Sequence, residues 1–188
     1  ILMSGLPLAG KDSWIAEHGE NALREKCSRI AGQGEDAQEK RTGIGRETKA
    51  ENVAGNGRKT SEERLLVISL DDIREELRIP PAKKSDQIAR IATERAKDCL
   101  RQRRAFIWNA TNIVRETRQR LIDLFAGYGA RVHIRYLEAP YRELLARNQK
   151  RARSIPPDVL EGMIQKLEPP APWEAFEVQR SAGDGQWF

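Results

Sequence analysis

The amino-terminal segment reads Ile1-Leu2-Met3-Ser4-Gly5-Leu6-Pro7-Leu8-Ala9-Gly10-Lys11-Asp12-Ser13. Four mostly apolar residues, a pattern typical of a buried strand, lead into Gly5. Gly10 and Lys11 follow five positions later, where a helical pattern begins. This order of strand, glycine-rich turn and helix matches the G-x-x-x-x-G-K spacing of a phosphate-binding P-loop. An ordinary strand–turn–helix joint without a ligand is the alternative interpretation.

A P-loop needs this spacing because its backbone N–H groups must wrap around a phosphate. Gly5 and Gly10 permit the required backbone conformations and a close approach to the ligand. The helix that begins at Lys11 adds unpaired N–H groups and the positive end of its dipole, and the Lys11 amine adds a full charge near the β- and γ-phosphates. We predict that Lys11 is catalytic and that the nucleotide-binding residues are Gly5, Leu6, Pro7, Leu8, Ala9, Gly10, Lys11, Asp12 and Ser13.

The residue after Lys11 departs from the usual P-loop pattern, in which a Ser or Thr hydroxyl binds Mg²⁺. Asp12 occupies that position here, and Ser13 follows it. A carboxylate is also a hard oxygen ligand for Mg²⁺, so metal binding can persist directly or through water. We therefore predict Asp12 as a metal ligand, with Ser13 as the alternative.

The composition is that of a globular protein. The chain has 188 residues, of which 39% are hydrophobic, a length and content that suit one domain.

No run approaches the roughly 18 apolar residues of a membrane span and no signal peptide is visible, so we expect a cytoplasmic protein without a membrane partner. Cys27 and Cys99 match no metal-site spacing, which favours buried or free thiols in a reducing compartment. The net charge of +5 is compatible with a phosphate-rich partner. Because the sequence begins directly on a core strand with no initiator Met, we interpret it as a domain cut from a longer chain or as a fragment, so the full-length chain can carry additional domains.

Residues 31–63 differ in composition from the rest of the chain. They are rich in glycine and in charges of both signs, and their large aliphatic residues are Ile44 and Val53 alone. Such a segment buries too little apolar surface to offset the entropy lost on ordering it. We predict a disordered insertion at 31–63, within a domain that spans 1–180 and precedes a flexible tail at 181–188.

Beyond this insertion, short apolar runs alternate with helical patterns. Further strands are predicted at 65–70, 105–108 and 132–137, and a short fifth strand at 176–178. This alternation predicts an α/β fold, specifically a three-layer P-loop NTPase fold with a mostly parallel sheet of about 4–5 strands flanked by helices. In such sheets ligands bind beyond the carboxyl ends of the strands.

Polar residues follow each of these strands. The glycine loop follows the first strand, Asp71 to Arg74 the second, Asn109 to Asn112 the third, and Glu138 the fourth. Parallel strands end at the same edge of a sheet, so these residues are expected to meet where the P-loop holds its phosphate. The convergence of four segments supports the P-loop interpretation more strongly than any one motif.

Asp71 is the candidate general base. It lies just past a strand, near the expected γ-phosphate, where an acceptor hydroxyl can transfer its proton to a carboxylate as it attacks in line. The alternative is that Asp71 caps the helix that follows. Arg74 lies about one helical turn further along and can reach a phosphate on the acceptor. Its alternative is a solvated ion pair with neighbouring glutamates.

A basic stretch joins the next two predicted helices and reads Arg147-Asn148-Gln149-Lys150-Arg151. If this stretch is helical, Arg147 and Arg151 share a face because they are four residues apart. Phosphoryl transfer needs positive charge over the transferring group, often delivered by a mobile segment that closes. We predict a basic helical lid in which Arg147 and Arg151 are catalytic; a solvated helix face is the alternative.

Together these motifs resemble the P-loop kinase domain of the polynucleotide 5′-hydroxyl kinase-like family. The family comprises end-healing enzymes of phages and bacteria, and many of its relatives are predicted AAA-type ATPases or kinases. The matching segments occur in the family's order and cover most of the chain outside the insertion; they are residues 5–11, 69–74, 110–112 with Arg115 and Arg118, 144–151 and 155–160.

The resemblance implies a P-loop kinase domain over 1–180, with ATP as the donor and Mg²⁺ as the metal. It implies four catalytic residues, namely Lys11 as phosphate clamp, Asp71 as base, and Arg147 and Arg151 as lid arginines. It also implies an acceptor-binding set, namely Arg74, Thr111 and Asn112. Two residues depart from the family pattern, because Asp12 replaces Ser or Thr and Asn109 stands where relatives often have Asp.

The expected function is therefore an ATP-dependent kinase that phosphorylates the 5′-hydroxyl end of RNA or DNA, with that end as its nucleic-acid partner. One alternative is a P-loop kinase of the same fold that acts on a small alcohol, such as a nucleoside or a sugar. A second alternative, from another class, is a nucleotide-binding, RNA-associated module with weak catalysis, in which Asp12 marks a degenerate loop.

Overall fold

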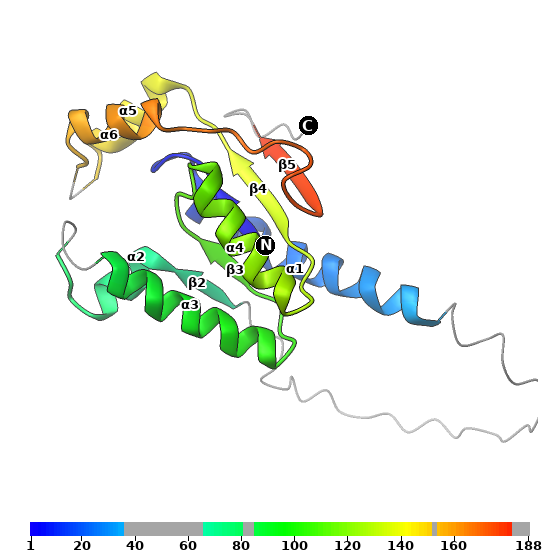
Figure 1. Ribbon diagram of the computed structural model, residues 1–188. Coiled ribbons are helices and arrows are strands. Elements are labelled where there is room, and N and C mark those ends of the chain that lie inside the picture. Colours follow the sequence, from blue (N-terminus) through cyan, green and yellow to red (C-terminus); the bar gives the residue numbers. More distant parts are fainter. Residues whose placement is uncertain (36–65, 81–84, 152–153, 182–188) are drawn as a thin grey trace, which may run out of the picture.

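The computed structural model describes residues 1–35, 66–80, 85–151 and 154–181, and of residues 26–35 it describes the backbone alone. The described strands form a sheet in the order β2-β3-β1-β4-β5, and every pairing in it is parallel (Figure 1). Their bounds are β1 (Leu2–Ser4), β2 (Val67–Ser69), β3 (Ile107–Asn109), β4 (His133–Leu137) and β5 (Glu177–Ser181). The predicted parallel α/β sheet is confirmed, including its fifth strand.

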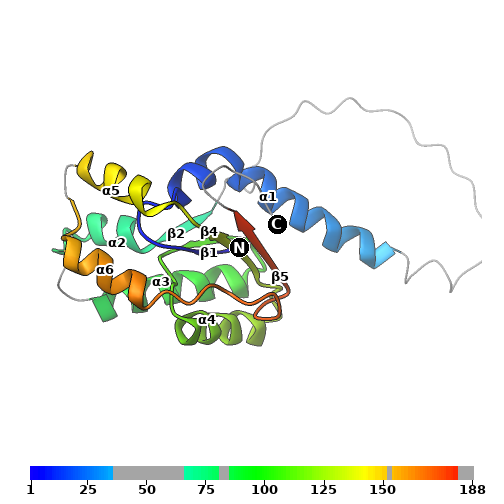
Figure 2. The same cartoon turned by 90° about the horizontal axis from the view of Figure 1, so that it is seen from above.

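Helices cover both faces of this sheet. Their bounds are α1 (Lys11–Glu35), α2 (Leu70–Glu76), α3 (Ser85–Arg101), α4 (Arg115–Gly127), α5 (Tyr141–Gln149) and α6 (Pro157–Gln165). Helix α1 lies on one face, and α3 and α4 lie on the other (Figure 2). Helices α5 and α6 lie beyond the carboxyl ends of the strands (Figure 1). Within the described ranges, no helix is long and apolar enough to cross a membrane.

Two apolar clusters fill the layers on either side of the sheet. Successive residues of a strand point to opposite faces, so Leu2 packs in the cluster under α3 and α4, whereas Met3 packs in the cluster under α1. In the first cluster, Phe125 of α4 makes edge-to-face contacts with Phe106 and Trp108 at centroid distances of 5.4 and 5.8 Å. This burial on both faces explains why the strands read as continuous apolar runs.

Some element bounds differ from those predicted. Strand β2 is limited to Val67–Ser69, and α2 begins at the very next residue. Helix α1 continues to Glu35, so the first five residues of the predicted insertion at 31–63 are helical. The rest of that predicted segment and the tail after Ser181 lie outside the described residues.

A buried ion pair ties α4 to the segment that leads into β5. Arg118 is fully buried and donates two hydrogen bonds to the Glu174 carboxylate, at 2.8 and 3.0 Å. The same guanidinium donates to the carbonyl oxygens of Asn112, Ile113 and Glu168. A buried charge is tolerated only when it is paired and hydrogen-bonded in this way. Arg118 therefore joins α4 to the segment after β3 and to the segment between α6 and β5.

Candidate phosphate-binding site

The loop between β1 and α1 adopts a conformation that requires glycine. Gly5 has φ +135° and Gly10 has φ +98°, in the left-handed half of backbone space. A Cβ atom on Gly5 would lie 2.3 Å from the carbonyl oxygen of Leu137, at the end of β4. The Gly5 N–H donates to the Thr111 carbonyl at 2.9 Å, which joins this loop to the segment after β3. The predicted glycine loop is thus clamped between its two neighbouring strands.

The side chain of Lys11 lies inside this loop. Its Nζ donates to the carbonyl oxygens of Gly5 and Leu6 at 3.0 and 2.8 Å. Loss of hydration on burial lowers the pKa of Lys11 from 10.5 to about 8, and the negative charges of Asp12 and Asp71 oppose that shift. The amine is mostly charged at neutral pH and is aimed at the centre of the loop.

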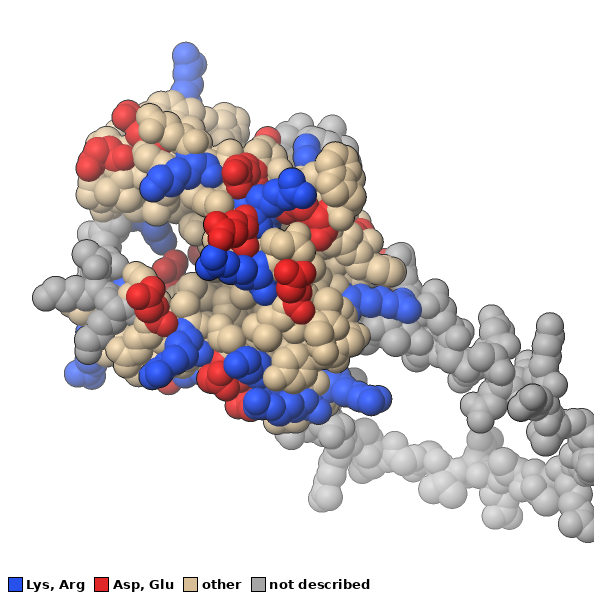
Figure 3. All heavy atoms as spheres, in the orientation of Figure 1, with Lys and Arg blue, Asp and Glu red and all other residues tan. Residues whose placement is uncertain are grey.

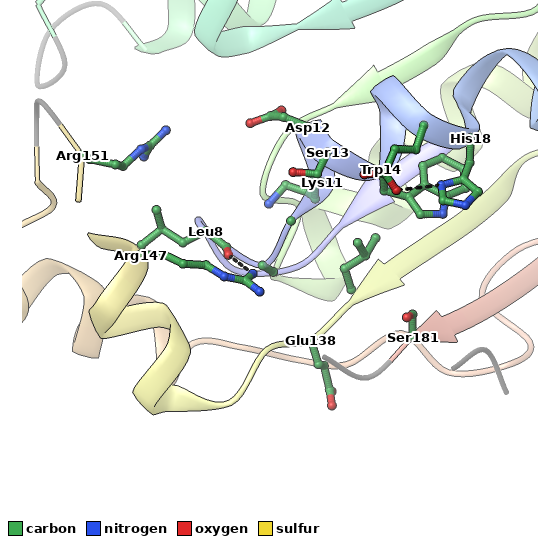
Figure 4. Close-up of a pocket in the computed structure, with 14 residues that line it drawn as sticks. Leu8, Lys11, Asp12, Ser13, Trp14, His18, Glu138, Arg147, Arg151 and Ser181 are labelled. Carbon is green, nitrogen blue, oxygen red and sulfur yellow. Dashed lines mark hydrogen bonds and ion pairs between the residues drawn. The ribbon is translucent and has the colours of Figure 1, made fainter. Parts of the chain in front are cut away.

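A cavity of about 760 Å³ opens over the loop. Its walls come from four places: the loop with the first turns of α1, the end of β4, the end of β5, and the lid arginines. In Figure 4 the side chains of Lys11, Asp12 and Arg151 point into the same open space from opposite sides. The cavity therefore collects basic groups and the carboxylates of Asp12, Glu17 and Glu138 at the carboxyl edge of the sheet.

The two predicted lid arginines both reach this cavity. Arg147 Nη1 donates to the Leu8 carbonyl at 2.8 Å (Figure 4). Its Nη2 donates to Glu143 Oε2 at 2.7 Å. Arg147 belongs to α5, and Arg151 lies just after it. Arg151 is exposed and close enough to Lys11 for its charge to affect the lysine pKa. The solvated-face alternative does not describe Arg147, which contacts the loop itself.

Asp71 lies in the first turn of α2 with an exposed side chain. The residue that caps this helix is Ser69, whose hydroxyl accepts a hydrogen bond from the Asp72 N–H at 3.2 Å. The alternative that Asp71 is a helix cap is therefore not supported. Asp71 is close enough to Lys11 to affect its pKa, although it is not among the residues that line the cavity.

The predicted acceptor-binding residues have different environments. Arg74 donates to the Pro80 carbonyl at 3.0 Å, and Thr111 is half-buried next to Gly5. Asn112 is buried, has φ +46°, and donates from its side-chain amide to the Met3 carbonyl at 2.6 Å. The Asn112 amide thus supports β1, and its role in binding the acceptor stays a prediction.

A comparison with protein families matches residues 41–170 to an AAA domain. The match covers more than half of the chain, and it begins after the glycine loop. The chain belongs to this family. Among solved structures, a sugar kinase from Janibacter sp. HTCC2649 aligns with a TM-score of 0.56 and 16% identity, over 98% of this chain and 85% of that one. At this identity the likeness concerns the fold, and together with the family match it confirms the predicted three-layer α/β fold of the P-loop NTPase type. A comparison with curated proteins finds no match.

The cavity offers a suitable set of donors for a magnesium–nucleotide complex. Magnesium usually takes one or two protein oxygen ligands and completes its octahedron with water and phosphate. Asp12 and Ser13 are consecutive and exposed, and both line the cavity. A carboxylate and a hydroxyl beside a phosphate-binding loop fit that requirement.

Some cavity residues of the AAA domain were not predicted as site residues. Trp14 and His18 stack with ring centroids 5.8 Å apart and planes 16° apart, and they form the wall contributed by α1. Their spacing of four residues places them on one helix face, which is the signal that sequence reasoning overlooked. Ser181 also lines the cavity, at the end of β5. Its position depends on how β5 is placed in the sheet.

Proposed function

We propose that this AAA domain is an ATP-dependent phosphotransferase that moves the γ-phosphate of ATP to a hydroxyl group. The observation that carries the proposal is the Lys11 ammonium group, which lies inside a glycine loop and, among the described residues, donates its hydrogen bonds to the Gly5 and Leu6 carbonyls. A polyphosphate that enters the loop replaces these two weak acceptors with anionic oxygens. The position of the Lys11 amine in the loop therefore favours the binding of an anion.

In the proposed reaction the acceptor oxygen attacks the γ-phosphorus in line, and the bond from that phosphorus to the bridging oxygen breaks to release ADP. Asp71 accepts the proton of the acceptor hydroxyl. Arg147 and Arg151 stabilise the charge on the transferring group. Asp12 and Ser13 are the candidate ligands of Mg²⁺, which when bound neutralises charge on the β- and γ-phosphates.

For the acceptor we favour the 5′-hydroxyl end of RNA or DNA. The support is the order of the motifs along the chain, the net charge of +5, and Arg74 near the carboxyl edge of the sheet. A small alcohol is the second candidate, because a protein described as a sugar kinase has a similar fold. A second observation also agrees with a small acceptor. On the face seen in Figure 3, basic and acidic side chains are interspersed, and the described residues form no continuous basic band.

The test is transfer of label from γ-labelled ATP with Mg²⁺ to a 5′-OH RNA, a 5′-OH DNA, and a panel of sugars and nucleosides. Lys11→Ala serves as the blank, and Asp71→Asn tests the base. Labelled oligonucleotide ends that disappear in both variants support the favoured acceptor. Label confined to a small alcohol favours the second candidate. Bound ATP without any transfer contradicts the proposed activity and favours a nucleotide-binding module.

A further inference from the structure

A hydrogen bond joins the P-loop helix to the neighbouring strand at the edge of the site. Asn109 Nδ2 donates to Asp12 Oδ1 at 2.7 Å, across 97 residues of sequence. Asn109 is the last residue of β3 and is buried, whereas Asp12 is exposed and lines the cavity. One oxygen of this carboxylate is therefore oriented by a fixed amide, and the side chain points into the cavity (Figure 4).

This pair inverts the usual chemistry of the two positions. In P-loop NTPases Mg²⁺ is held by a Ser or Thr hydroxyl after the lysine and by an Asp on a nearby strand. Strand β3 pairs directly with β1, and Asn109 contacts the residue after Lys11, so Asn109 occupies the place of that strand carboxylate. Here the carboxylate is on the helix and the neutral group is on the strand.

We propose that Asp12 and Asn109 have exchanged these two roles. Asp12 supplies the anionic oxygen for the magnesium–nucleotide complex, and Asn109 is the positioning residue that orients it. This inference rests on the proposed function, because it assumes that the cavity takes a magnesium–nucleotide complex. It goes further by assigning a role to Asn109. It also requires that the effects of substitutions at Asp12 and Asn109 on magnesium-dependent nucleotide binding depend on each other.

The coupling follows from the charge that each combination of residues creates. Asp12→Ser leaves no carboxylate at either position. Asn109→Asp places two carboxylates within hydrogen-bonding distance of each other, where they repel and lose the amide donor. The double variant Asp12→Ser/Asn109→Asp restores one carboxylate and one hydroxyl. The two single changes are therefore expected to be harmful and the double change mild, a non-additive pattern that residues in contact commonly show.

The experiment measures the affinity for a fluorescent ATP analogue with and without Mg²⁺, in the whole chain. We expect Mg²⁺ to strengthen binding in the unmodified protein, and each single variant to reduce that gain by about tenfold. The double variant is expected to recover the gain to within about threefold. Asp12→Asn, which keeps the shape but removes the charge, is expected to behave like Asp12→Ser. Asp86→Ser, the same change in the first turn of α3, is expected to leave the gain unchanged.

The possible results separate this inference from the proposed function. A magnesium gain that persists in Asp12→Ser and Asp12→Asn overturns the exchange, even if the unmodified protein binds ATP and transfers label. A double variant no better than the singles, with all proteins folded by thermal unfolding, also overturns it. Absence of nucleotide binding in the unmodified protein overturns both the inference and the proposed function.

Discussion

Arg147 Nη1 donates a hydrogen bond to the carbonyl oxygen of Leu8 at 2.8 Å, although 139 residues separate them. Leu8 has φ +70°, in the left-handed region that residues other than glycine seldom adopt. Glu143, one turn earlier on α5, accepts a second hydrogen bond from the same guanidinium at 2.7 Å. The last turn of α5 and the glycine loop are therefore in direct contact.

Arg147→Ala is expected to lower the rate of phosphoryl transfer by about a hundredfold or more, because it removes a charge-assisted donor from the developing phosphate charge. The measurement is kcat with saturating ATP and acceptor. Arg142→Ala, on the same helix but exposed, is the matched control and is expected to retain the rate. Equal rates in the two variants would contradict a role for the lid.

The titration of Lys11 is expected to make ATP affinity depend on pH. Burial lowers its pKa to about 8, and a bound polyphosphate favours the charged amine, so affinity falls as pH rises above 8 and binding near pH 8 takes up protons. Calorimetric titrations in buffers of different ionisation enthalpy measure both effects. Lys11→Arg keeps its charge throughout this range and is expected to show no such fall.

The lowered pKa of Lys11 also affects the stability of the fold. Whereas ATP affinity is expected to fall as pH rises, the contribution of Lys11 to stability is expected to increase. Between pH 8 and 10.5 the unfolded chain binds a proton at Lys11 that the folded chain lacks. The contribution of Lys11 to the free energy of unfolding therefore increases with pH across this window. Comparison of denaturant unfolding with that of a Lys11→Met variant measures it. A difference between the two proteins that does not change with pH would exclude the shift.

Gly5→Ala is expected to disrupt the loop. The added Cβ meets the Leu137 carbonyl oxygen at 2.3 Å, so β4 or the loop must move. Gly129→Ala is the matched control, because Gly129 also has a positive φ, of +80°, but has open space around its Cβ position. The control is expected to cost about 1–2 kcal/mol in unfolding free energy from backbone strain alone. Gly5→Ala is expected to cost more and to abolish ATP binding.

Glu174→Gln is expected to destabilise the fold by about 3–5 kcal/mol, because it leaves the Arg118 charge buried without its carboxylate. Both side chains are almost fully buried, at 0% and 2% exposure. Glu116→Gln breaks an exposed pair with Arg120 on the same helix and is expected to have little effect. Chemical denaturation measures both. Equal small losses in the two variants would contradict the structural role of Arg118.

Local sequence patterns predicted the order of the elements and the phosphate-binding loop. The phosphate-binding motif is defined by the sequence spacing of Gly5, Gly10 and Lys11. The apolar runs predict strands that are buried on both faces. The exact ends of the strands and helices were predicted less well. Strand β2, for example, ends at Ser69 because the hydroxyl of Ser69 caps α2. Such a boundary depends on a hydrogen bond that periodicity does not encode.

Long-range packing decided what each polar residue at the sheet edge does. Asn109 ends β3 and Asn112 lies three residues after it, yet Asn109 orients Asp12 at the cavity and Asn112 is buried against Met3. Only the folded sheet brings β3 beside β1 and so distinguishes these two amides. The sequence alone was enough for the α/β order and the glycine loop, because both arise from neighbouring residues. The contacts of Arg147 with Leu8 and of Asn109 with Asp12 required the tertiary structure, because each joins segments that only the parallel crossovers place together.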